Sequence, residues 1–209
     1  MKEFTCPSCG AAVLFRSAAS ILAVCDYCCS TLVRHDVDLE NVGSMAELQA
    51  DGSPLQLRAE GRYRGVPFTV VGRIQLRYPH GLWNEWHLLF GDQRSGWLGE
   101  AGGVYAVSFL TRVKEKIPRL EDLHPGDALV LRGQPYEVTS VEDAFCIAGQ
   151  GELPFQIGPG FAASAAELAG PGDAFAALDY SEEEPLVFLG EYVDFKDLHL
   201  SGLREVDGW

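Results

Sequence analysis

The sequence predicts a mainly β protein: a small N-terminal ribbon, then one or two small β-barrel or curled-sheet modules with a few short helices. Two C-x-x-C pairs in the first 35 residues flank a hairpin pattern. From Leu55 onward, short alternating stretches such as "LQLRAEGRYRGVPFTVVGRIQLRY" are punctuated by glycine and proline, which is typical of small sheets and barrels. Two further stretches carry the capping pattern of short helices.

The cysteine pairs predict a zinc ribbon over residues 1–35. Each C-x-x-C pair puts two sulfurs on one tight turn, and the spacing between the pairs matches structural zinc sites. Because four protein ligands leave no coordination position open, we predict a structural rather than a catalytic zinc ion. A redox pair or unligated core thiols are the alternatives. The predicted ligands are Cys6, Cys9, Cys25 and Cys28.

Cys29 leaves an ambiguity, because it forms C-x-x-x-C with Cys25 and could replace Cys28 as a ligand. The usual spacing favours Cys28, so Cys29 and Cys146 are interpreted as small hydrophobic residues. About 35 residues bury too little surface to fold alone. Zinc would supply about 10 kcal/mol or more of folding free energy. Since the body has its own core, removal of the metal is expected to unfold the ribbon alone.

Residues 36–54 are predicted to be a linker that contains a short helix. In "SMAELQADG", Ser44 and Glu47 have the spacing of a capping box. The later stretch "GFAASAAELAG" repeats this spacing with Ser164 and Glu167, which predicts a second short helix.

The body is divided into a β module over residues 55–119, with a tryptophan-rich hairpin, and a second β module over 120–209, with an acidic tail. Tyr63–Val70 and Leu131–Val138 share the pattern Arg-Gly-x-Pro-aromatic-x-Val. This predicts equivalent hairpins from an internal duplication; a coincidental hairpin pattern is the alternative. The residues expected at matching positions are Pro67 with Pro135 at the strand start, and Phe68 with Tyr136 in the core.

The segment "YPHGLWNEWHLLFGDQRSGWLGE" is the most unusual stretch of the body, and "LWNEWHLLF" is the first of its two predicted strands. Strand alternation puts Trp83, Glu85 and His87 on one face, and the more apolar face, with Trp86, is expected to point into the core. In one interpretation, these three residues line a ligand pocket, with Glu85 and His87 as hydrogen-bonding or acid–base groups. In the other, Glu85 is structural and pairs with an arginine. The candidate arginines are Arg73, Arg77 and Arg94.

Charge and composition narrow the function classes. The net charge of −14 disfavours nucleic-acid binding, which depends on neutralising phosphates. Residues 58–119 nevertheless carry ten basic and five acidic side chains, whereas 150–209 carry two and twelve. No apolar run is long enough for a membrane span, and the start lacks the apolar stretch of a signal peptide. A reducing cytoplasmic location is therefore expected, which also favours metal binding over disulfides.

The sequence resembles a bacterial family of domains of unknown function. The resemblance rests on W-x-E-[WY] followed by W-L, here Trp83, Glu85, Trp86, Trp97 and Leu98, and covers residues from about 55 to the end. It implies a bacterial cytosolic protein in which a ribbon is a common companion, and it implies no activity.

No catalytic set, phosphate loop, dinucleotide motif or H-E-x-x-H pattern occurs, so no catalytic residue is predicted. We therefore expect a non-enzymatic interaction or scaffolding protein with a protein partner. The alternative is a small-molecule-binding or hydrolytic domain that uses Glu85 and His87.

Overall fold

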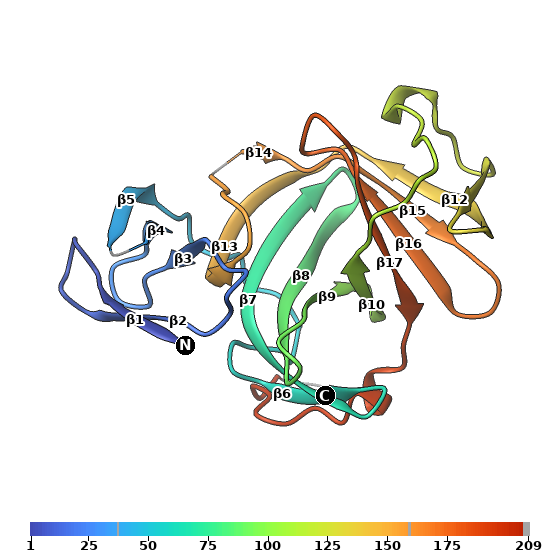
Figure 1. The fold of residues 1–209 in the computed structure, drawn as a ribbon. Helices are drawn as coiled ribbons and strands as arrows, with labels where there is room; N and C mark the ends of the chain where they lie inside the picture. The colour runs from blue at the N-terminus through green and yellow to red at the C-terminus, as the bar shows by residue number, and fades with distance from the viewer. Residues whose placement is uncertain (37, 159, 207–209) are drawn as a thin grey trace.

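The computed structural model describes residues 1–36, 38–158 and 160–206 (Figure 1). In these ranges the regular structure is β-strand, apart from two 3-10 turns, η1 and η2, and the mainly β prediction is confirmed. The turns are η1 (Leu120–Asp122) and η2 (Phe195–Leu198). The strands are β1 (Lys2–Thr5), β2 (Ala12–Phe15), β3 (Leu22–Val24), β4 (Ser30–Arg34), β5 (Leu39–Ser44), β6 (Glu60–Tyr63), β7 (Val66–Tyr78), β8 (Gly81–Phe90), β9 (Ser95–Ala101), β10 (Val104–Leu110), β11 (Ala128–Leu131), β12 (Gln134–Glu142), β13 (Phe145–Leu153), β14 (Phe161–Ala162), β15 (Ala165–Ala169), β16 (Ala174–Asp179) and β17 (Leu186–Tyr192).

One antiparallel 15-stranded sheet contains every strand except β1 and β2, which pair with each other. Its order is β11-β12-β15-β16-β17-β10-β9-β8-β7-β13-β3-β4-β5, with β6 paired to β7 and β14 paired to β13. Figure 1 shows the strong curvature of β7 and β8 and the ribbon strands lying beside β13. Among the described residues the sheet does not close into a barrel, since its end strands β11 and β5 do not pair.

The body contains two ladders of the same construction. The first ladder runs β6-β7-β8-β9-β10 and the second runs β11-β12-β15-β16-β17. Both begin with a hairpin of identical register, in which Tyr63 pairs with Val66 and Leu131 pairs with Gln134. Both have a β-bulge at the same place, after Val70 in β7 and after Val138 in β12. The predicted equivalence of the two hairpins is confirmed.

Pro67 and Pro135 occupy matching positions in these hairpins, and Phe68 and Tyr136 are buried at matching places. Along the next three strands, equivalent residues are 80 positions apart, so that Leu88 corresponds to Leu168. The strands β13 and β14 are an insertion that the first ladder lacks, and β13 crosses over to pair with β7.

The two ladders meet where β10 pairs with β17. In this pairing Phe109 lies opposite Leu189, and these residues are equivalents of each other. An antiparallel pair of equivalent residues lies on a two-fold axis. The two ladders are therefore related by an approximate two-fold axis that passes between Phe109 and Leu189.

The sheet has two faces, which we name after residues of β8. The Trp86 face holds two cores: one under β6 and η2, around Trp86, Leu88 and Phe90, and one under residues 111–123 in the second ladder. The Glu85 face holds a third core at the ribbon side, where Trp97 packs near residues of β3, β7 and β13. The alternation predicted for β8 is confirmed, because Trp86 is completely buried.

Neither predicted short helix forms. Residues 45–52 form a strap without helix or strand instead, because long-range contacts override the local capping pattern. Met45 packs in the core at the ribbon side, and the backbone N–H of Gln49 donates to the side chain of Gln75. Residues 165–169 form the interior strand β15, in which alternate residues Ala166 and Leu168 are completely buried. Strand β5 also lies within the residues predicted to be a linker.

Candidate functional site

The four predicted ligands lie together at the tip of the ribbon. The sulfur atoms of Cys6, Cys9, Cys25 and Cys28 all lie within 4.8 Å of one another. Cys6 Sγ lies 3.7 Å from Cys28 Sγ, and Cys9 Sγ lies 3.7 Å from Cys25 Sγ. A tetrahedral zinc ion with Zn–S bonds of about 2.3 Å separates its sulfur ligands by about 3.8 Å. The cluster therefore fits a four-coordinate metal ion, and the spacing of the sulfurs is that of a closed site.

Two matching turns position the sulfurs. In the first turn the N–H of Gly10 donates to the carbonyl of Cys6, and in the second the N–H of Cys29 donates to the carbonyl of Cys25. The residue that closes each turn has a left-handed backbone, with φ of 76° at Gly10 and 56° at Cys29. Cys29 is thus the structural counterpart of Gly10, and its sulfur lies outside the cluster. This resolves the sequence ambiguity in favour of Cys28 as the clustered cysteine.

Among the clustered cysteines, Cys28 has the hydrogen bonds that favour a thiolate, whereas burial raises the pKa of Cys25. The Cys28 sulfur lies 3.2 Å from Ser30 Oγ, and hydrogen bonds from the Ser30 hydroxyl and backbone lower the pKa of Cys28 to about 6. A deprotonated sulfur is the form that binds a metal ion. Cys146, by contrast, is buried in the body, and burial raises the pKa of its thiol to about 11.

The ribbon is joined to the first ladder through Glu152 in β13. Glu152 pairs with Ala23 of β3, which continues the main sheet into the ribbon. Its buried carboxylate accepts N–H bonds from Arg16 and Ser17, at 2.8 and 3.0 Å, and forms an ion pair with the Arg16 guanidinium. A buried carboxylate is stable only with such partners. Consequently, the ribbon continues the sheet of the body and is not a separately packed unit.

His87 supports this junction from the body side. Its Nδ1–H donates to the carbonyl of Glu152 at 2.9 Å, and its Nε2 lies 2.6 Å from Ser95 Oγ. The ring is completely buried against Trp97, with 5.2 Å between ring centroids. Burial lowers the pKa of His87 to about 4, so the imidazole is neutral at pH 7. Both ring nitrogens are therefore engaged inside the protein.

Glu85 and Trp83 lie on the same face as His87, as the alternation predicts. Trp83 Nε1 donates to Glu85 Oε1 at 3.2 Å, and Glu85 is partly exposed. Burial, together with the negative charges of Asp179 and Glu167 in the second ladder, raises the pKa of Glu85 to about 7. The three predicted ligand-site residues are thus neighbours, but His87 points into packing and hydrogen bonds of its own.

The expected pairing of Glu85 with an arginine is wrong. Arg73 lies directly opposite Trp86 in the β7–β8 register, so its side chain is on the Trp86 face. Arg77 lies opposite Leu82, which is also on that face, and Arg94 pairs with Asp92 in the β8–β9 turn. The two-residue period of a strand therefore separates these cations from Glu85.

A buried polar network on the Trp86 face was not foreseen from sequence. Arg73 lies over the Trp86 ring, 4.6 Å from its centroid, and bonds to Asn84 and to Asp51 of the strap. Glu100 accepts the indole N–H of Trp86 at 2.9 Å. The only sequence signal was polar residues at core positions of β7, β8 and β9. The network ties the strap to the first ladder.

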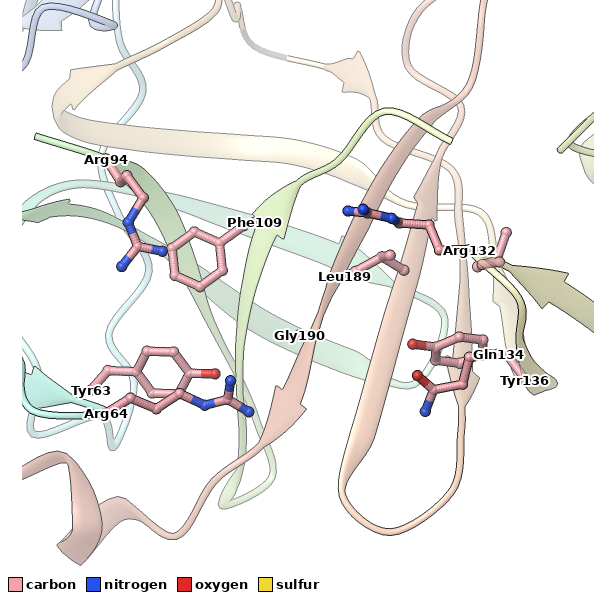
Figure 2. A pocket seen from close by; sticks show the side chains of 10 residues that line it. Tyr63, Arg64, Arg94, Phe109, Arg132, Gln134, Tyr136, Leu189 and Gly190 are labelled. Carbon is pink, nitrogen blue, oxygen red and sulfur yellow. The ribbon is translucent and has the colours of Figure 1, made fainter. Parts of the chain in front are cut away.

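A cavity of about 430 Å³ lies on the approximate two-fold axis, on the Trp86 face (Figure 2). Phe109, Leu189 and Gly190 form its floor. The β6–β7 turn contributes one wall and the β11–β12 turn contributes the opposite wall. The remaining lining residues are Tyr63, Arg64, Arg94, Leu131, Arg132, Gln134 and Tyr136. The repeated Arg-Gly pattern is the sequence signal for this site, although from the sequence alone it predicts only two equivalent hairpins.

Comparisons with known proteins identify a family and nothing closer. No curated protein matches the chain, and no solved structure matches it. No helix among the described residues is long and apolar enough to cross a membrane. The model of one family, described as a domain of unknown function (DUF4178), matches residues 56–195, which include all of both ladders. The chain therefore belongs to the DUF4178 family, with a four-cysteine cluster preceding the family domain.

Proposed function

We propose that this protein is a non-enzymatic interaction module in which a structural zinc ion holds a contact ribbon against the DUF4178 domain. The observation that carries the proposal is the closed cluster of four sulfurs, with Sγ distances that suit tetrahedral zinc. Four thiolates leave no open position for substrate, so the metal serves stability. The net charge of −14 favours a protein partner over a nucleic acid.

The ribbon also offers a contact surface. Tyr27 lies in the second cysteine turn and is 79% exposed, and Val42 on the end strand β5 is 51% exposed. A large aromatic side chain held out on a rigid turn is a frequent anchor at protein interfaces. The junction at Glu152 would keep this anchor in a fixed position relative to the body.

Metal analysis tests the first half of the proposal. We expect purified protein to contain about one equivalent of zinc, as the closed-site geometry requires. Cys25→Ser should abolish binding. Cys29→Ser and Cys146→Ser are matched controls and should leave the zinc content unchanged, because neither sulfur belongs to the cluster. A metal-free protein with an ordered ribbon would refute the proposed role.

Capture of partners tests the second half. Deleting the ribbon would expose the core to which Leu22 and Val24 contribute. A point substitution is the better test, because it leaves this core covered. We expect Tyr27→Ala to lose a partner that wild-type protein captures from its host. Val104→Ala, which removes a 56% exposed side chain from the body, should retain it. Equal capture by both variants would show that Tyr27 is not the anchor.

Glu85 supports a second candidate, a small-molecule-binding or hydrolytic role. Its pKa of about 7 suits proton exchange at neutral pH, and among the described residues it has no cation partner. Trp83 supplies a reporter, since its indole N–H donates to Glu85. In a ligand screen followed by NMR, a true ligand should shift the Trp83 indole signal in wild type and not in Glu85→Gln. If the screen finds no such ligand, the interaction role is the better explanation of the structure.

A further inference from the structure

We propose that the cavity on the two-fold axis binds a small aryl oxyanion, a planar apolar group that carries a phosphate or a carboxylate. This inference goes beyond the metal and partner proposals, because the cavity lies in the body away from the cysteine cluster, and its failure would leave those proposals standing. Its volume of about 430 Å³ is within the range of small-molecule sites.

Arginines of equivalent position reach into the cavity from both ladders. In Figure 2 the guanidinium groups of Arg64 and Arg132 point toward its middle from opposite sides. Each arginine is the first residue of a tight two-residue turn and has a left-handed backbone, with φ of 50° and 51°. Asparagine, aspartate and glycine are the residues that suit this conformation. The presence of arginine in both turns, despite its poor fit to the backbone, points to a use for the side chain.

Arg132 is the free cation of the site. In the part of the chain that the structure describes, its guanidinium has no hydrogen-bond or ion-pair partner. Arg64 pairs with Glu191 through Nε and one terminal nitrogen, which leaves further N–H donors. Arg94 bonds to Asp92 and lies over Phe109, 5.0 Å from the ring centroid. The guanidinium fork matches the oxygens of phosphates and carboxylates.

Tyr136 and Gln134 add hydrogen-bonding groups to the wall of the cavity. Tyr136 is only 6% exposed, yet its hydroxyl points into the cavity and has no hydrogen-bond partner among the described residues. The amide of Gln134 lies beside it, also without a partner in those ranges. The open cavity leaves both groups accessible to solvent, so each can donate a hydrogen bond to a bound ligand. A ligand oxygen between Arg132 and Tyr136 would satisfy both.

The apolar part of the ligand is inferred from the cavity floor. Phe109 and Leu189 present a ring and an aliphatic surface, and the Tyr63 ring forms the side wall. A planar group could stack on the rings while its oxyanion meets the arginines. Glu191 beside Arg64 adds a negative charge at one end of the cavity. The oxyanion is therefore expected at the Arg132 end, away from that carboxylate.

Titration calorimetry of the full chain at low salt tests the site with phenyl phosphate, benzoate and inorganic phosphate. Phenyl phosphate or benzoate should bind saturably, and more tightly than inorganic phosphate because the ring is also buried. Preference for phenyl phosphate would identify a phosphate ligand, and preference for benzoate a carboxylate. Arg132→Gln should weaken binding about tenfold, the loss expected for one charge-assisted bond.

The matched control is Arg112→Gln, which removes an exposed arginine outside the cavity and should change affinity less than about twofold, within the range of a surface substitution. Because Arg132 is exposed and unpaired among the described residues, its loss should not unfold the protein, and melting curves will verify this. The proposal is overturned if neither aryl anion shows saturable binding at concentrations up to about 10 mM, a limit tenfold weaker than a 1 mM site. It is equally overturned if inorganic phosphate binds as tightly as both, or if the two arginine variants have the same effect.

Discussion

The two ladders of the body have the same backbone plan and very different side chains. Where the first ladder has Trp86 and Trp97, the equivalent positions of the second have Ala166 and Ala177. The hairpin turn, the register and the bulge are nevertheless identical. The comparison teaches that local turn chemistry and strand pairing fix this fold. The buried side chains can be large or small, according to what covers each ladder.

The neighbours of the ladders explain the difference. Strand β13 crosses only the first ladder, where the Glu152 carbonyl passes so close to Gly72 that a Cβ would lie 1.9 Å from it. The equivalent of Gly72 in the second ladder is Ser140, and no strand of the described residues lies beside it in this way. The first ladder thus carries the ribbon and needs a glycine and a polar junction. The second has lost, or never had, these constraints.

Removal of the metal should have the largest effect, and it should destabilise the first ladder more than the second. Without zinc the ribbon loses about 10 kcal/mol or more of folding free energy and should unfold. Because β3 pairs with β13, the amides near Glu152 should then exchange quickly with solvent. Strands β15 to β17 should keep their protection. Hydrogen exchange of wild-type protein and of Cys25→Ser measures this.

Cys29→Ser is the control for that experiment, because it preserves the cluster. The sequence alone predicts that the whole body is untouched by metal loss, whereas the sheet continuity predicts damage at the first ladder's edge. If hydrogen-exchange protection is lost equally in both ladders, the expected difference between them is wrong. Protection retained throughout β13 would show that the ribbon is only loosely attached.

Trp86 and Ala166 test the packing half of the comparison. Trp86→Ala should lower the free energy of unfolding by about 3–5 kcal/mol, because it opens a cavity and leaves Glu100 without its indole donor. Ala166→Trp, the reverse change in the second ladder, should cost about 1–3 kcal/mol by overpacking. Chemical denaturation measures both. A mild effect of Trp86→Ala would mean that the strap collapses to fill the space.

The predictable part of this protein follows from short-range signals. The cysteine spacing located the cluster, the Arg-Gly-x-Pro repeat located two equivalent hairpins, and alternation in β8 assigned Trp86 to the core. Long-range contacts could not be foreseen in the same way. The helix signal at Ser44 was overridden by the docking of the strap, and the pairing of Arg73 with Asp51 depends on which face each strand presents. The cavity needed both hairpins to be placed in space.

Glu85 should destabilise the folded protein at neutral pH. Folding raises its pKa from 4.5 to about 7, so the folded state keeps a proton that the unfolded chain loses in this interval. The free energy of unfolding should therefore fall as the pH rises from about 4.5 to 7. Glu85→Gln should be about 1–2 kcal/mol more stable than wild type at pH 8, after allowance for partial exposure.

At pH 4 the same substitution should have little effect, because the wild-type carboxyl is then largely protonated in both the folded and the unfolded state. Glu137→Gln removes an exposed carboxyl of the second ladder and is the matched control. This expectation is opposite in sign to that of a salt-bridged glutamate, whose loss destabilises the protein. A Glu85→Gln variant that is less stable than wild type at pH 8 would reveal an unrecognised cation partner.

The smallest effect is expected at the two arginine turns. Their backbone conformations are the same, but the two arginine side chains make different contacts. Arg132→Asn should raise the free energy of unfolding by about 0.5 kcal/mol, because asparagine tolerates the left-handed backbone better and no described contact is lost. Arg64→Asn should gain nothing, since it also removes the ion pair with Glu191 and the contact with the Tyr63 ring. Urea denaturation of the two variants gives the comparison. If Arg132→Asn proves destabilising, Arg132 is held by the fold itself, and the cavity loses the free cation on which its ligand depends.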